Sequence, residues 1–352
     1  MDVFFQLTLY LPFLLPRDSK DWGTQPVDYT DGEFQIRIVV LPQEAAKDAP
    51  KGVDDMVATP LSGPRDITMF QITSTPHKYF YEAIVVAVRG TVENKDALFT
   101  PLARVRFFNA AIEATRRFLN FCRAIARDTE IYFNGPDLSL ENPTFGGFPH
   151  CEGWFDPETG ESVGNEKTNI CMGEFVGGRS GIRPVPWERL QSEVRSPSHP
   201  RIDVLASLDA QVALVGYDHH KAVLLSAIAV EVAIKSFLRR SGMDDDLLKK
   251  LEDSVELSFW EKYFDLLLRL AAQPSLKEKI PSLYKRVEIL FRVRNKIAHE
   301  GICYLEKNGK GVPLRLRHRE VNDLVATASD VIDWVDSLTT PVSQTVTQPS
   351  AP

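Results

Sequence analysis

The sequences AVLLSAIAVEVAI, at residues 222–234, and LYKRVEILFRVRNKIAH, at residues 283–299, decide the fold of the second half of this chain. The first is apolar nearly all round, which is typical of a helix at the centre of a bundle. The second places apolar residues at the three-and-four spacing of a helix that buries one face: Leu283, Val287, Leu290 and Ile297. Gly301 follows where a glycine commonly ends a helix. The two stretches predict an all-helical C-terminal region.

The helical pattern extends on both sides of these stretches. Helices are predicted at residues 206–238, with a break near Gly216, and at residues 244–255, 259–272, 283–299 and 319–338. The N-terminal part alternates apolar runs with turn-forming clusters, which predicts strands at residues 3–15, 34–41, 66–72, 80–89 and 130–133, loops at 18–32 and 43–63, and one helix at 101–128. We therefore expect an α+β domain over residues 1–135, an irregular loop or linker over 136–200, a helical bundle over 201–340 and a disordered tail over 341–352.

Composition narrows the class of protein. The chain has 352 residues, a net charge of −7 and 43% hydrophobic residues, which fits a globular protein of two domains. Four scattered cysteines do not form a disulfide framework. Residues 3–15 follow the acidic Asp2, contain Pro12 and are shorter than the roughly 20 residues that span a bilayer. We expect a cytoplasmic protein that does not bind a membrane.

Charge is distributed unevenly along the chain. Residues 201–340 are neutral, so the rest of the chain carries the whole net charge of −7. The acidity of the whole chain argues against a protein that coats nucleic acids generally. It does not argue against a local phosphate-binding site in the neutral half.

Two charged residues interrupt apolar helical patterns. Arg294 lies in the apolar stripe of residues 283–299, and Glu231 lies inside the apolar run 222–234. A buried, unpaired charge is costly, so each of them needs a partner, a phosphate or a cleft open to water. We expect Glu231 to pair with Arg294 and to orient its guanidinium.

His299 falls in the last turn of the same predicted helix, where the negative end of the helix dipole favours an imidazolium. Asn295 lies one turn earlier on the same face. A fixed cation beside a histidine that can exchange protons suits phosphodiester chemistry.

The segment from Arg294 to His299 resembles the R-N-x3-H form of the Arg-x4-6-His motif of HEPN domains. The neighbouring features also resemble the Apea-like HEPN subfamily: a preceding helix with an embedded Glu231, a Glu300-Gly301 helix end and a closing helix with Trp334. The resemblance covers roughly residues 206–340 and does not extend to residues 1–200.

The resemblance implies a helical bundle, commonly a homodimer in which two motifs meet at a shared cleft. It implies a metal-independent endoribonuclease that leaves a 2′,3′-cyclic phosphate, as an effector in prokaryotic defence or in a toxin–antitoxin system. Arg294 would stabilise the charged transition state, His299 would move protons, and Asn295 would orient the imidazole or the phosphate. An antitoxin or a trigger would act through the N-terminal domain.

Further basic residues are candidates for contacts with RNA phosphates: Arg292 and Lys296 beside the motif, and Arg315 and Arg317 in a hairpin-like segment with a short strand. The adjacent His219 and His220 point about 100° apart on a helix, and no third ligand is evident, so we expect no metal site there. We expect no cofactor.

A second interpretation remains open. Arg294 and Glu231 could form a structural pair only, and His299 could simply cap a helix. The bundle would then be a non-catalytic HEPN-like module for dimerisation or for binding RNA or a nucleotide.

Overall fold

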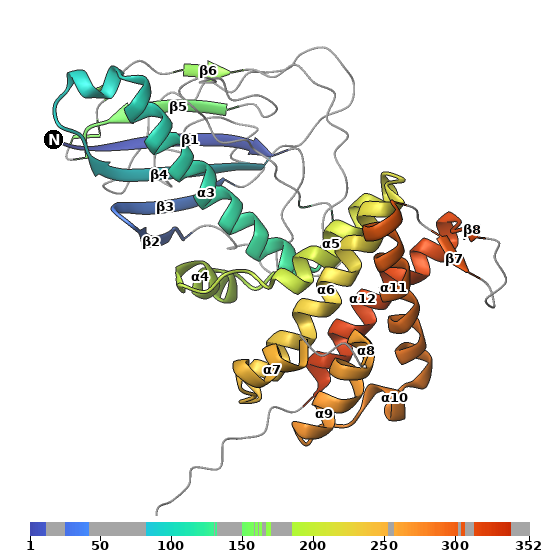
Figure 1. Ribbon diagram of the computed structural model, residues 1–352. Helices are drawn as coiled ribbons and strands as arrows, with labels where there is room; N and C mark the ends of the chain where they lie inside the picture. The colour runs from blue at the N-terminus through green and yellow to red at the C-terminus, as the bar shows by residue number, and fades with distance from the viewer. Residues whose placement is uncertain are drawn as a thin grey trace, which may run out of the picture. The chain divides into compact units, whose positions relative to one another are not determined.

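The computed structural model describes residues 1–11, 25–41, 82–129, 131, 150–157, 159–160, 162–163, 167–169, 185–252, 257–301, 304–306 and 313–338. The chain divides into two compact units, Met1–Pro200 and Arg201–Pro352. The first holds an antiparallel sheet and the second is mostly helical (Figure 1).

In the part of the chain that the structure describes, the N-terminal unit is built on a six-stranded sheet with the order β2-β3-β4-β1-β5-β6. Every neighbouring pair of strands is antiparallel. The strands are β1 (Asp2–Leu11), β2 (Val27–Asp31), β3 (Phe34–Leu41), β4 (Glu82–Thr91), β5 (His150–Phe155) and β6 (Lys167–Asn169). Strand β1 is central because it pairs with β4 on one side and with β5 on the other.

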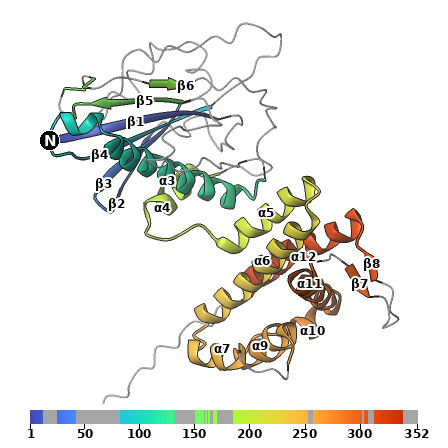
Figure 2. The same ribbon diagram turned by 45° about the horizontal axis from the view of Figure 1, so that its top comes forward.

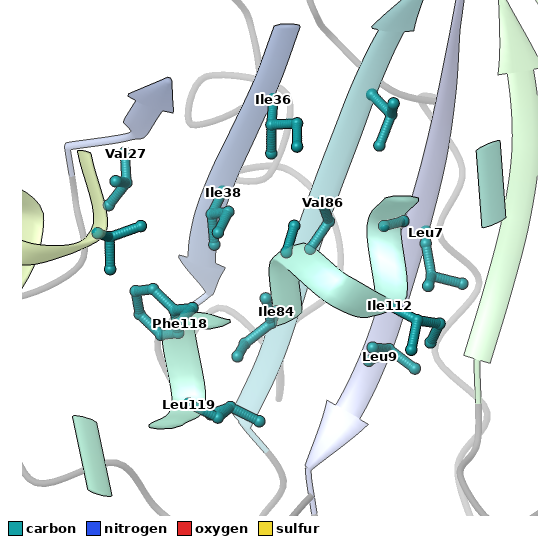
Figure 3. Packing of buried hydrophobic residues seen from close by; sticks show 14 of the residues in the cluster. Leu7, Leu9, Val27, Ile36, Ile38, Ile84, Val86, Ile112, Phe118 and Leu119 are labelled. Atoms are coloured by element: carbon teal, nitrogen blue, oxygen red, sulfur yellow. The ribbon is translucent and has the colours of Figure 1, made fainter. Parts of the chain in front are cut away.

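One face of this sheet is covered by helix α3 (Pro101–Ala126), as both ribbon views show (Figures 1 and 2). Alternate residues of β1, β3 and β4 point to this face, and they form one buried cluster with the apolar side of α3. Figure 3 shows Ile112, Phe118 and Leu119 of α3 above the sheet side chains. The helix starts at Pro101, where the Thr100 side chain accepts a hydrogen bond from the Ala103 amide.

Helix α4 (Trp187–Arg195) also belongs to this unit and packs against α3. The ring of Trp187 lies 6.2 Å from that of Phe118. Arg117 of α3 donates hydrogen bonds to the carbonyl oxygens of Val194, Ser196 and Ser198, which fixes the end of α4. A short 3-10 helix, η1 (Asp96–Phe99), precedes α3.

Within the described residues, the N-terminal prediction is confirmed for an α+β arrangement with one long helix, and it is wrong in two places. Strand β2 lies within the predicted loop 18–32, because Val27 and Tyr29 pair with Ile38 and Ile36 of β3. Strands β5 and β6 and helix α4 lie within the predicted linker 136–200. The strand predicted at 66–72 and the loop at 43–63 lie outside the described residues, as does the tail 341–352.

Among its described residues, the C-terminal unit contains four longer helices: α5 (Ile202–Val215), α6 (His219–Arg240), α11 (Pro281–Glu300) and α12 (His318–Ser337). Shorter segments join them: α7 (Asp245–Glu252), α8 (Phe259–Glu261), the π-helical η2 (Lys262–Leu266), α9 (Leu267–Leu270), α10 (Leu276–Lys279) and the hairpin of β7 (Tyr304–Glu306) and β8 (Pro313–Arg315). The predicted helices are present, with the break at Gly216 where α5 ends. Helix α10 was not predicted.

Helix α6 packs against α5, α12 and α11, which explains its long apolar run (Figure 1). Arg201 at the start of α5 binds the carboxylate of Asp336 at the end of α12. The expectation that α6 is enclosed on all sides is wrong along one stripe, where Ile228 is 44% exposed. Among the described helices of both units, none is long and apolar enough to cross a membrane.

Replacing Phe118 with alanine tests the packing of α3 on the sheet. Phe118 is fully buried, and truncation of such a ring leaves a cavity, so the free energy of unfolding should fall by about 3–5 kcal/mol. Phe99→Ala is the matched control, because Phe99 is 57% exposed and its loss should change stability by less than about 0.5 kcal/mol. Urea unfolding followed by tryptophan fluorescence measures both. Equal stability of the two variants would contradict this packing.

Candidate functional site

The candidate site lies on the last two turns of α11. The apolar residues Val293 and Ile297 of these turns are buried, and they fix how the helix is rotated against the bundle. Arg294 lies at the edge of the buried face, while Asn295 and His299 lie on the exposed face. The helix ends at Gly301, whose φ of 67° is left-handed and whose amide donates to the Ile297 carbonyl at 2.9 Å.

The expected pair of Arg294 and Glu231 exists, but it is loose. The closest guanidinium nitrogen of Arg294 lies 4.0 Å from a Glu231 carboxylate oxygen, and the side chains are 39% and 28% exposed. Glu231 instead accepts a 2.6 Å hydrogen bond from Lys235, one turn further along α6. Neither charge is buried, because both side chains reach water at the edge of the helix contact.

Lys235 is the residue that sequence reasoning missed. Its ammonium also lies 5.5 Å from the centre of the Tyr263 ring, so the lysine is held between a carboxylate and an aromatic face. The signal was present in the sequence, since a glutamate four residues before a lysine is a favourable helical pair. With Lys235 compensating Glu231, the positive charge of Arg294 is not fully neutralised within the described site.

Asn295 contacts Arg294 and not His299. A guanidinium nitrogen of Arg294 donates to the Asn295 side-chain oxygen at 3.1 Å. The amide oxygen is thereby used, which leaves the Asn295 amide nitrogen as a donor toward the exposed face. This arrangement suits a bound anion better than it suits orientation of the imidazole.

His299 is exposed in the last turn of α11. None of the described residues forms a hydrogen bond or an ion pair with its imidazole. The imidazole is therefore accessible to a ligand from solvent.

The residues expected to contact RNA differ in their surroundings. Arg292 pairs with Glu288 at 2.6 Å and lies 5.8 Å over the ring of Trp260, and Lys296 pairs with Glu300 at 2.8 Å.

Two further candidates for RNA contact come from the segment after α11. Arg317 is exposed where α12 begins, and its backbone amide donates to Glu320 at 2.8 Å. Arg315 ends strand β8, which matches the short strand expected there, but its side chain lies outside the described residues.

No family model, curated protein or solved structure matches the chain. In the described part of the chain, no group of three or more His, Cys, Asp or Glu side chains could hold a metal ion.

Replacing Glu231 with glutamine tests whether its carboxylate forms only partly exposed ion pairs with Lys235 and Arg294. Because the contacts of Glu231 with Lys235 and Arg294 are partly exposed, the free energy of unfolding should change by less than about 1 kcal/mol. Leu290→Ala is the positive control, since Leu290 is fully buried and its truncation should cost about 2–5 kcal/mol. Urea denaturation measures both. A loss of about 3–5 kcal/mol for Glu231→Gln would instead identify a buried charge network.

Proposed function

We propose that the helical unit is a metal-independent endoribonuclease of the HEPN type, with its active site on the C-terminal turns of α11. The observation that carries this proposal is the grouping of an incompletely neutralised arginine, an amide donor and a solvent-exposed histidine within six residues of one helix end.

Arg294 is suited to bind the scissile phosphate. Its guanidinium is fixed on one side by Asn295 and approached on another by Glu231, while 39% of the side chain remains exposed. A guanidinium binds a phosphate through parallel N–H donors, and it stabilises the charge that builds up on the phosphoryl oxygens in the transition state. The amide nitrogen of Asn295 adds a donor beside it.

His299 would carry the proton transfers. The 2′-hydroxyl oxygen attacks the adjacent phosphorus and gives up its proton to a base, and the bond from phosphorus to the 5′-oxygen breaks as that oxygen receives a proton from an acid. The products are a 2′,3′-cyclic phosphate and a 5′-hydroxyl end. Each chain supplies one imidazole at this place, so we propose that two copies pair and provide the base and the acid together.

The substrate would be RNA, because the reaction uses the 2′-hydroxyl. Arg292 and Lys296 flank the site in ion pairs with Glu288 and Glu300. Exposed ion pairs contribute at most about 1 kcal/mol each, so a phosphate can replace the carboxylate at little cost. We further propose that the N-terminal unit receives the trigger or antitoxin that controls an effector of defence or toxin–antitoxin type.

One observation favours the alternative of a non-catalytic binding module. Catalytic histidines are usually oriented by a hydrogen bond to the second ring nitrogen, and the described residues of one chain offer none to His299. Under this alternative, Arg294 and Asn295 bind a phosphate group and no bond is broken.

Cleavage assays on the purified, full-length protein separate these functions. Wild type should cut RNA in EDTA and leave 2′,3′-cyclic ends. His299→Ala should be slower by about 10²–10⁴-fold, as expected for loss of an acid–base group. Arg294→Ala should be slower by about 10²–10³-fold, as expected for loss of a charge-stabilising donor.

Arg286→Ala is the matched control, because Arg286 lies on α11 and pairs with Asp330 of α12 at 2.6 Å. It should cut RNA at the wild-type rate. RNA binding that depends on Arg294 but not on His299, without cleavage by any variant and without toxicity of the wild type in cells, would overturn catalysis in favour of the binding module.

A further inference from the structure

The starts of helices α6 and α12 bring together two histidines that are 99 residues apart in the chain. His219 is the first residue of α6, and His318 is the first residue of α12. The Nε2 atom of His219 lies 3.2 Å from the Nδ1 atom of His318. Unlike the adjacent His219 and His220, which diverge on one helix, His219 and His318 come from two helices and bring two ring nitrogens together.

The spacing of the two nitrogens fits a shared metal ion. Imidazole nitrogens bind Zn²⁺ at about 2.0–2.1 Å, so two of them at a tetrahedral angle lie about 3.4 Å apart. The observed 3.2 Å matches this spacing, and each ring has to turn by roughly 35° from the direct hydrogen bond so that both nitrogen lone pairs point at one ion. In the ion-free form, the same two nitrogens can share one hydrogen bond, in which one donates and the other accepts.

The surrounding structure brings the two histidines together before any ion binds. Helices α6 and α12 pack directly against each other, so their first residues are fixed relative to one another. Asp218 caps α6 by accepting a hydrogen bond from the Lys221 amide at 3.1 Å. The ring of Tyr217 lies 5.1 Å from that of His318 and packs beside it.

We propose that His219 and His318 form a binding site for one divalent transition-metal ion of the class that prefers imidazole, which includes Cu²⁺, Ni²⁺ and Zn²⁺. Water fills the remaining coordination positions, because no third His, Cys, Asp or Glu of the described residues joins the pair. The positive ends of the two helix dipoles oppose a cation, so the affinity is modest and follows the order Cu²⁺ above Zn²⁺.

Bound metal would link the start of α6 to the start of α12 and so stabilise the helical unit. The site uses neither Arg294 nor His299, and it does not depend on the proposed ribonuclease activity.

The test is metal binding by full-length protein purified without a polyhistidine tag. Calorimetric titration with Cu²⁺ and with Zn²⁺ should give one ion per chain for wild type. Binding should be at least tenfold weaker for His219→Ala and for His318→Ala. Added metal should raise the melting temperature of the wild type and not that of these two variants. His220→Ala is the matched control, because this adjacent histidine should leave binding unchanged. Circular dichroism checks that each variant is folded.

Electron paramagnetic resonance of the Cu²⁺ complex provides a second readout that does not depend on folding of the variants, and two coordinated imidazole nitrogens are expected. Wild type that binds no ion at millimolar metal would overturn the proposal, and the histidines would then form only a hydrogen bond. Binding by His318→Ala within twofold of wild type would overturn it as well.

Discussion

The helical unit depends on the burial of α6 against α5, α11 and α12. Most of the side chains that α6 buries are small or branched and apolar. One stripe of the helix, which holds Ile228, Glu231 and Lys235, stays in contact with water. Arg294 of α11 reaches the same stripe. The helix contact therefore brings charged side chains to its solvent edge without the large cost of burying them.

The charges on this stripe determine whether Arg294 of α11 can bind an anion. Lys235 takes the close contact with Glu231, while Arg294 stays 4.0 Å from the carboxylate and bonds to the uncharged Asn295. A buried, tight Arg294–Glu231 pair would have had little capacity for a phosphate. The proposed function follows from this loose pairing together with the helix end at Gly301, which leaves His299 exposed in the last turn.

Apolar periodicity predicted the helices of the C-terminal unit well, because long amphipathic segments carry many independent signals. It failed for β2, β5 and β6, because short strands owe their structure to pairing: β2 with the neighbouring β3, β5 with β1, which is distant in sequence, and β6 with β5. At the site, the sequence identified the proximity of Arg294 and Glu231. It missed Lys235, although the i,i+4 spacing to Glu231 was visible in the sequence, and it missed the contact of His219 with His318, which depends on how α6 and α12 pack against each other.

The most direct test of the proposed chemistry is the cleavage of one short RNA in which a single ribose, at a linkage that wild type cuts, is replaced by 2′-deoxyribose. We expect that cleavage stops at this linkage and continues at the unmodified ones, because His299 has no 2′-hydroxyl to activate there. Continued cleavage at the deoxyribose linkage would contradict it, since the attacking group would then have to be water.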